Sequence, residues 1–289
     1  MSALVWGMIG AAVCALAAGL LLAWPRFAKA SGFTDRLLLL GPIAEAAALA
    51  TFAAEHFLAA RALATIVPHW LPGPLFWTYL VGAALLAAAI SLIAWRCVRW
   101  SAPLLAVLFL IIVATIDLPN LPKNIHERLF WILTVRETAF AGGAMVLAGC
   151  VWSRGRSAGA MLMAAGRWIV AGTFVFYAIE HFLFPTHVPG VPLEKMTPAW
   201  IPAPAVLGYL VGVVLLAAGI GLMLPRFRRT AAAGAGAVLL LLTVFFYVPI
   251  FLTEIHTPLA VEGMNYVGDT LLFAGTALLA GFGSEWSRV

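Results

Sequence analysis

Charged side chains are scarce in this sequence. Asp, Glu, Lys and Arg make up 10% of its 289 residues, whereas soluble globular domains carry about 25%. Hydrophobic residues make up 64%, and the mean hydropathy is +1.03. A soluble domain is therefore excluded. Because the apolar runs are continuous rather than alternating, they predict membrane-spanning helices and not the strands of a barrel.

Cysteine pairs of the CxxC type and nucleic-acid motifs are also absent. Cys14, Cys97 and Cys150 lie far apart, so the sequence predicts neither dithiol chemistry nor a cysteine metal site. The isoelectric point of about 9.4 would suggest nucleic acid for a soluble protein. Here the basic residues lie in short loops between apolar runs, where membrane topology explains them. We therefore expect membrane lipid as the surroundings and no nucleic-acid partner.

Nine apolar runs predict an all-α integral membrane protein with nine transmembrane helices. The predicted spans cover residues 3–24, 37–60, 75–95, 102–118, 130–150, 165–184, 204–224, 231–252 and 267–283.

The basic residues are distributed unevenly between the two predicted sides. Twelve lie in segments on one side and five on the other, and 12 + 5 accounts for all 17. The positive-inside rule then places the N-terminus outside and the C-terminus inside, in the inner (cytoplasmic) membrane of a bacterium. The twelve inner residues are Arg26, Lys29, Arg36, Arg96, Arg99, Arg154, Arg156, Arg167, Arg226, Arg228, Arg229 and Arg288.

The chain contains an internal repeat. The segment PHWLPGPLFWTYLVGAALLAAAISL from Pro68 aligns without gaps to PAWIPAPAVLGYLVGVVLLAAGIGL from Pro198, with 14 identities in 25 positions. Upstream, a Glu-His-Phe string occurs in both copies, and the second outer loop has five extra residues. Downstream, ETAFAGGAMVLAG from Glu137 resembles DTLLFAGTALLAG from Asp269.

The repeat predicts the domain organisation. A leading transmembrane helix and inner loop occupy residues 1–36, and two four-helix units follow at 37–150 and 165–283. Each unit has an even number of spans, so both copies have the same orientation. We expect a pseudo-two-fold axis along the membrane normal, as in parallel transporter repeats.

Ionisable residues gather on the predicted outer side. All six histidines and nine of the twelve acidic residues lie in the outer half, whereas Glu45 lies in the middle of a span. Ionisable groups within a membrane are costly and indicate function. We therefore predict Glu55, His56, Glu180 and His181 as catalytic residues. The structural alternative is that the Glu-His pairs cap helix ends or form hydrogen bonds between the repeats.

Three chemistries fit imidazoles and carboxylates around a pseudo-two-fold axis. His56, His181, His126 and His256 could bind a copper, zinc or iron ion. His56 and His181 could instead ligate a haem from symmetry-related helices. The third is proton-coupled binding of a quinone or a similar apolar molecule. Aromatic residues would hold its ring and the repeat-matched acids would support the site; these predicted cofactor-binding residues are Tyr79, Tyr209, Trp70, Trp200, Glu137 and Asp269.

The repeated unit resembles the DoxX-like/DoxD-like family of four-helix membrane proteins. The resemblance rests on Glu-His-Phe, a Pro-x-Trp-x-Pro loop and a Tyr-Leu-Val-Gly helix start, and it covers both units. Members are associated with redox systems, including a subunit of thiosulfate:quinone oxidoreductase. The resemblance implies quinone-linked redox chemistry, with His56 and His181 at the family's histidine and Tyr79 and Tyr209 at its aromatic position. The fusion of two units and the leading helix depart from the usual single unit.

The sequence leaves three functions open. The leading hypothesis is a membrane component of a redox system, possessing an outer-facing site between the two units and contacting a redox partner protein. A small-solute transporter is the runner-up, with the two units as moving halves. A non-catalytic assembly protein is the third.

Overall fold

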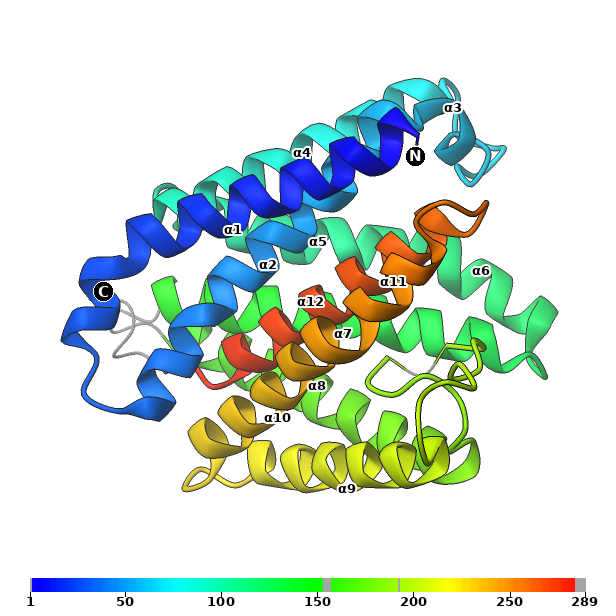
Figure 1. The fold of residues 1–289 in the computed structure, drawn as a ribbon. Helices are drawn as coiled ribbons and strands as arrows, with labels where there is room; N and C mark the ends of the chain where they lie inside the picture. Colours follow the sequence, from blue (N-terminus) through cyan, green and yellow to red (C-terminus); the bar gives the residue numbers. More distant parts are fainter. Residues whose placement is uncertain (1, 153–156, 192, 284–289) are drawn as a thin grey trace.

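In the computed structural model, shown in Figure 1, residues 2–152, 157–191 and 193–283 are described, and the regular elements among them are helices. The α-helices are α1 (Ala3–Lys29), α2 (Phe33–Leu58), α3 (Ala60–Leu63), α4 (Pro74–Ala94), α5 (Val98–Ile112), α6 (Leu118–Asn120), α7 (Arg128–Trp152), α8 (Ser157–Leu183), α9 (Pro204–Met223), α10 (Arg228–Leu242), α11 (Val248–Glu254) and α12 (Ala260–Ala280).

Among the described residues, eight helical stretches are long and apolar enough to cross a membrane. Two of them are composite, because α5 continues through α6 to Asn124 and α10 continues through α11 to Glu254. The ninth long helix, α12, is more polar in its first half, and 17 of its 21 residues are buried. The predicted all-α, multi-pass membrane fold is thus confirmed. Arg154, Arg156 and Arg288, which entered the orientation argument, lie outside the described residues.

The helices pack in the same order twice. In the first repeat, α2 packs on α4, α4 on α5, and α5 on α7; in the second, α8 packs on α9, α9 on α10, and α10 on α12. The two repeats meet through α2 with α12 and through α7 with α8, which are equivalent pairs, and through α7 with α12. Helix α1 lies outside this arrangement, against α2 and α4 (Figure 1). The unit boundaries at 37–150 and 165–283 stay a prediction.

A π-helical turn interrupts the third long helix of each repeat. The turns cover Val113–Asp117 and Thr243–Tyr247, 130 residues apart. Each is followed by a proline, Pro119 or Pro249, which lacks the N–H that an α-helix would use at that point. The N–H that closes each turn donates to a carbonyl five residues back. This wide turn re-aims the side chains at its end, and such turns are frequent at functional sites.

The two ends of the bundle differ in chemistry. At one end lie the connections 59–73, 121–127, 184–203 and 255–259, with four of the six histidines; we call it the histidine end. It is on the right in Figure 1, where α3, α6 and α11 lie. At the other end lie the connections 30–32, 95–97 and 224–227, beside basic residues such as Arg26 and Arg96; we call it the arginine end.

Small residues allow close contact between the two repeats. A Cβ added to Gly166 of α8 would lie 2.3 Å from the carbonyl oxygen of Gly142 in α7, too close for any real side chain. By contrast, nothing lies within 4 Å of a Cβ added to Gly172 on the same helix. Close approach of helices through small residues is the usual way to gain packing in a membrane, where no hydrophobic effect drives association.

We therefore predict that Gly166→Ala lowers the stability of the detergent-solubilised protein by about 1–3 kcal/mol, the usual cost of overpacking. Gly172→Ala is the matched control, and it should be neutral or stabilising because alanine favours a helix. Thermal unfolding of both variants measures the difference. Equal melting temperatures would contradict the close contact between α7 and α8.

Candidate functional site

The glutamates of the two Glu-His-Phe strings connect the repeats. Glu180 on α8 forms an ion pair with Arg128 on α7, with 2.5 Å between Oε2 and Nε. Glu55 on α2 accepts a hydrogen bond of 3.0 Å from the Nδ2 of Asn265 on α12. In the described residues the two glutamates share no hydrogen bond with each other. The hydrogen bonds between repeats that formed the structural alternative are therefore present.

The histidines of the two strings have different surroundings. The Nδ1 of each lies against the carbonyl oxygen four residues back, at 2.8 Å for His56 and 2.6 Å for His181. Because a carbonyl only accepts, Nδ1 carries a proton, and in the neutral ring Nε2 is then an acceptor. The Nε2 of His181 accepts the N–H of Gly190 at 2.8 Å. The Nε2 of His56 has no hydrogen-bond partner in the described part of the chain.

The remaining motif residues have packing roles. Phe57 stacks with Tyr79 at 6.2 Å between ring centroids, and Phe182 stacks with Tyr209 at 6.5 Å. The glycine three residues after each tyrosine leaves room for the histidine, since a Cβ on Gly82 would lie 2.8 Å from the Cβ of His56. This packing explains why the Glu-His-Phe and Tyr-Leu-Val-Gly strings occur together. The predicted roles of Tyr79 and Tyr209 toward a cofactor stay predictions.

The other predicted ligands lie on the surface of the histidine end. His126 and His256 are exposed in connections, and Trp70 and Trp200 are exposed in the loops before α4 and α9. In residues 2–152, 157–191 and 193–283 no three His, Cys, Asp or Glu side chains form a group that could hold a metal. A haem bound by His56 and His181 would require His181 to release Gly190. The described residues thus fit neither the four-histidine metal site nor the haem.

An arginine holds the repeat-matched acids at the centre of the bundle. Arg136 on α7 binds Asp269 on α12 at 2.5 Å and its neighbour Glu137 at 2.9 Å. All three side chains are at most 15% exposed. Asp117, at the end of the first π-helical turn, lies within electrostatic range of Arg136 and Glu137. Its Oδ2 is buried with no hydrogen-bond partner in the described residues. We call Asp117, Arg136, Glu137 and Asp269 the Arg136 centre.

The longer loop of the second repeat enters the bundle. Val188, Pro189, Gly190 and Val191 are buried beside α10 and α12. Gly190 has φ +98°, a conformation that favours glycine. The carbonyl of Pro189 accepts the hydroxyl of Tyr247 at 2.6 Å, while the N–H of Gly190 binds His181. One peptide group therefore connects Tyr247 to His181.

Two further contacts fasten this loop. Lys195 forms ion pairs with Glu254 at 2.6 Å and with Glu262 at 3.3 Å, and its ammonium lies 5.1 Å from the Tyr266 ring centroid. Partial burial, with nearby Arg128 adding to the effect, lowers the pKa of His187 below its usual value. This environment favours the neutral imidazole, and the backbone of His187 pairs with that of Met196 in an isolated antiparallel bridge.

The first repeat has no such loop. Residue 117 stands where the second repeat has Tyr247, since both end a π-helical turn and are 130 residues apart. The connection after His56 is five residues shorter than the one after His181, and it does not reach Asp117 by any hydrogen bond in the described residues. Accordingly, His56 and Asp117 are only half-buried, whereas His181 and Tyr247 are 2% and 1% exposed.

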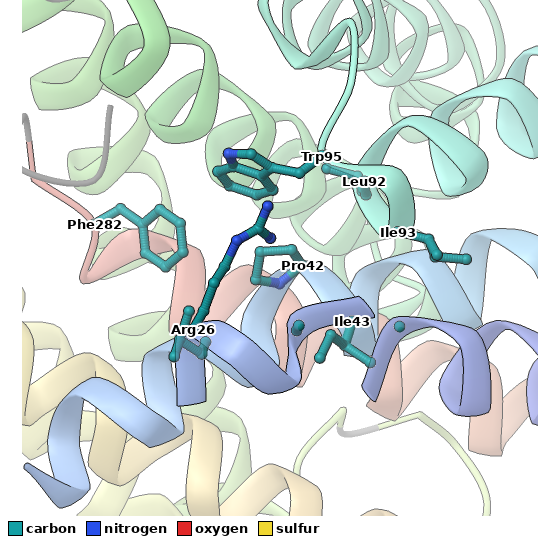
Figure 2. A pocket seen from close by; sticks show the side chains of 10 residues that line it. Arg26, Pro42, Ile43, Leu92, Ile93, Trp95 and Phe282 are labelled. Atoms are coloured by element: carbon teal, nitrogen blue, oxygen red, sulfur yellow. The ribbon is translucent and has the colours of Figure 1, made fainter. Parts of the chain in front are cut away.

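A small cavity at the arginine end is a weaker candidate. It lies between α1, α2 and α4, and Figure 2 shows Arg26 reaching between Pro42 and Phe282 toward Trp95. The guanidinium lies 5.0 Å from the centroid of the Trp95 ring, a cation–π interaction that holds the end of α1. The rest of the lining is apolar. The cavity thus contains no set of groups that could carry out chemistry.

Sequence reasoning missed several residues of this region. Arg128, Asn265 and Tyr247 were not singled out, although an arginine or asparagine in an apolar helix is itself a signal. The ion pair of Arg136 with Asp269 was not predicted either, because it joins two helices that are distant in sequence. The sequence did not predict that residues 188–191 are buried within the bundle. The five-residue insertion was the one sequence feature that marked this loop as different.

Comparison with known proteins gives a family but no function. The chain belongs to the family described as Domain of unknown function (DUF8561), whose model matches residues 46–129 and 170–257, more than half of the chain. The two matched segments contain the Glu-His-Phe strings of the two repeats. No curated protein and no solved structure matches the chain. The resemblance to DoxX-like proteins stays a prediction.

The Arg136 centre gives a testable prediction for stability. Arg136→Leu leaves buried carboxylates without their partner, which typically costs about 3–5 kcal/mol. The double variant Arg136→Leu/Asp269→Leu should recover part of that loss, because it removes one of the stranded charges. Arg61→Leu, an exposed charge at the same end, is the control and should have little effect. A double variant no more stable than Arg136→Leu would contradict the pairing across the repeats.

Proposed function

We propose that this member of the DUF8561 family is a membrane component of a redox system that binds a quinol at the histidine end of its first repeat. The observation that carries the proposal is a difference in hydrogen bonding between equivalent residues of the two repeats. His181 and Tyr247 bind one of the chain's own peptide groups, whereas none of the described residues forms a hydrogen bond with His56 Nε2 or with the Asp117 carboxyl.

The residue types favour a ligand with two hydrogen-bond donors. His56 Nε2 accepts, because its Nδ1 carries the proton. At the second position, Tyr247 donates to a carbonyl, whereas Asp117, in the ionised form that could take up a proton from the ligand, would only accept. A molecule that satisfies both acceptors therefore offers two O–H or N–H groups. A hydroquinone has two hydroxyls on opposite sides of an apolar ring, and an oxidised quinone has none.

The surroundings support an apolar ring. Phe57 and Tyr79, stacked beside His56, are 40% and 46% exposed on the surface of the bundle, where a lipid-soluble molecule would approach. His56 and Asp117 would bind the two hydroxyls and accept their protons when the ring is oxidised. The electrons would pass to a separate redox protein. We propose that the histidine end faces the outside of the bacterial inner membrane, so these protons would leave on that side.

One observation favours a second candidate, a transporter for a small organic cation. The Arg136 centre contains three carboxyl groups and a single guanidinium. An ammonium or guanidinium ligand also offers two donors, and it would balance this surplus of negative charge.

Binding of a short-chain benzoquinol tests the proposal. We predict that the reduced form quenches tryptophan fluorescence of the solubilised protein and binds at least tenfold more tightly than the oxidised form. Asp117→Ala should weaken binding by about tenfold to a hundredfold, since it removes a hydrogen bond to a charged group, which contributes about 1.5–3 kcal/mol. His56→Ala should weaken binding by about twofold to tenfold, since it removes a hydrogen bond to a neutral ring, which contributes about 0.5–1.5 kcal/mol.

The controls come from the second repeat and the surface. Tyr247→Phe is the matched control for Asp117, and His256→Ala is the control for an exposed histidine at the same end; both should leave the affinity unchanged. Equal affinity for quinol and quinone, or unaltered binding in His56→Ala, would refute the quinol site. Binding of a guanidinium or ammonium compound without any quinol binding would favour the transporter instead.

A further inference from the structure

A carboxyl group lies in the middle of α2 without any partner. Glu45 is 0% exposed, and both of its oxygens lack a hydrogen-bond partner in the described residues. Every residue of α2 from Gly41 to Thr51 is buried, because α1, α4, α10 and α12 surround this helix. An ionised carboxylate in such surroundings is prohibitively costly without a counter-charge, so Glu45 is held in its neutral, protonated form.

In the described residues, no charged group on the surrounding helices forms an ion pair with the Glu45 carboxyl. The long helices that pack against α2 carry Arg26, Lys29, Arg228, Arg229, Glu262 and Asp269 in their described residues. None of them forms an ion pair with Glu45; Arg229 pairs with Asp35 at the arginine end, and Asp269 pairs with Arg136. On α2 itself, Glu55 binds Asn265 and His56 binds a backbone carbonyl.

The fold does not need an acid at this position. The Glu-His pairs set an offset of 125 residues between α2 and α8, which places Val170 at the position of Glu45. Val170 is also 0% exposed. An apolar side chain therefore fills the equivalent place in the second repeat. Burial of the carboxyl in the first repeat lowers the stability of the fold, and no hydrogen bond within the described residues compensates for it.

A row of polar groups between α2 and α12 leads from the histidine end toward Glu45. From the histidine end, the row begins with Glu55 and Asn265; the Oδ1 of Asn265 is buried and has no hydrogen-bond partner in the part of the chain that the structure describes. Asp269 follows one turn later on α12. Glu45 lies deeper in the bundle, beside Gly275, which is six residues after Asp269 or about 9 Å further along α12; a Cβ on Gly275 would lie 3.0 Å from the Cβ of Glu45.

From this row we infer that Glu45 is an intramembrane proton-binding site that exchanges its proton with the aqueous phase at the histidine end, along the contact between α2 and α12. The ligand is a proton, delivered by water through the polar groups of the row. The inference does not depend on the quinol proposal, because it concerns a different group and a different helix contact.

Infrared spectroscopy of the protein in liposomes tests the site. We expect an absorption of a protonated carboxyl at neutral pH that is lost in both Glu45→Gln and Glu45→Val and that shifts when the medium is changed to D2O. Asp35→Asn, which changes an acid at the arginine end, should leave this band unaltered. The thermal stability of Glu45→Val should equal or exceed that of the unsubstituted protein, because it copies Val170.

Three results would overturn the inference. A spectrum without a band that depends on Glu45 would mean that the carboxyl is ionised. A band that does not shift in D2O over hours would mean a sealed group without proton exchange. A clear drop in melting temperature in both Glu45→Val and Glu45→Gln would assign the carboxyl to the stability of the fold.

Discussion

The ion pair between Arg136 and Asp269 is the interaction on which the histidine end depends. It joins α7 of the first repeat to α12 of the second, and Glu137 binds the same guanidinium. In a low-dielectric interior, a charge of this kind is tolerable only with its partners in place. The pair therefore fixes how the two repeats meet and brings Asp117 close to a positive charge. The ligand site that we propose beside it exists only while this contact holds.

Much of the fold follows from sequence alone. Continuous apolar runs predicted the helices, and the Pro-x-Trp-x-Pro and Tyr-Leu-Val-Gly strings predicted the repeat. The π-helical turns before Pro119 and Pro249 were not predicted, because hydropathy is insensitive to one extra residue in a turn. The extension of α12 to Ala260 was also missed, since its polar first half is buried against other helices rather than exposed to lipid.

The site was predicted only in part. Hydropathy patterns revealed the Glu-His pairs and the matched acids Glu137 and Asp269, because ionisable residues stand out in apolar helices. Their partners could not be predicted, since contacts such as Arg128 with Glu180 join helices that are distant in sequence. The two Glu-His strings also looked equivalent by sequence, apart from the five extra residues in the second outer loop. Their difference depends on the path of the loop at residues 188–191. No local sequence pattern shows that one peptide group of this loop forms hydrogen bonds with both His181 and Tyr247.

This asymmetry is the central claim, and cysteine accessibility tests it most directly. In a background without the three native cysteines, Asp117→Cys and Tyr247→Cys would be treated in intact cells with a membrane-impermeant thiol reagent. The account predicts that the cysteine at position 117 reacts from outside, whereas the one at position 247 is protected by residues 188–191. Equal reactivity at both positions, or reaction at 247 alone, would contradict it.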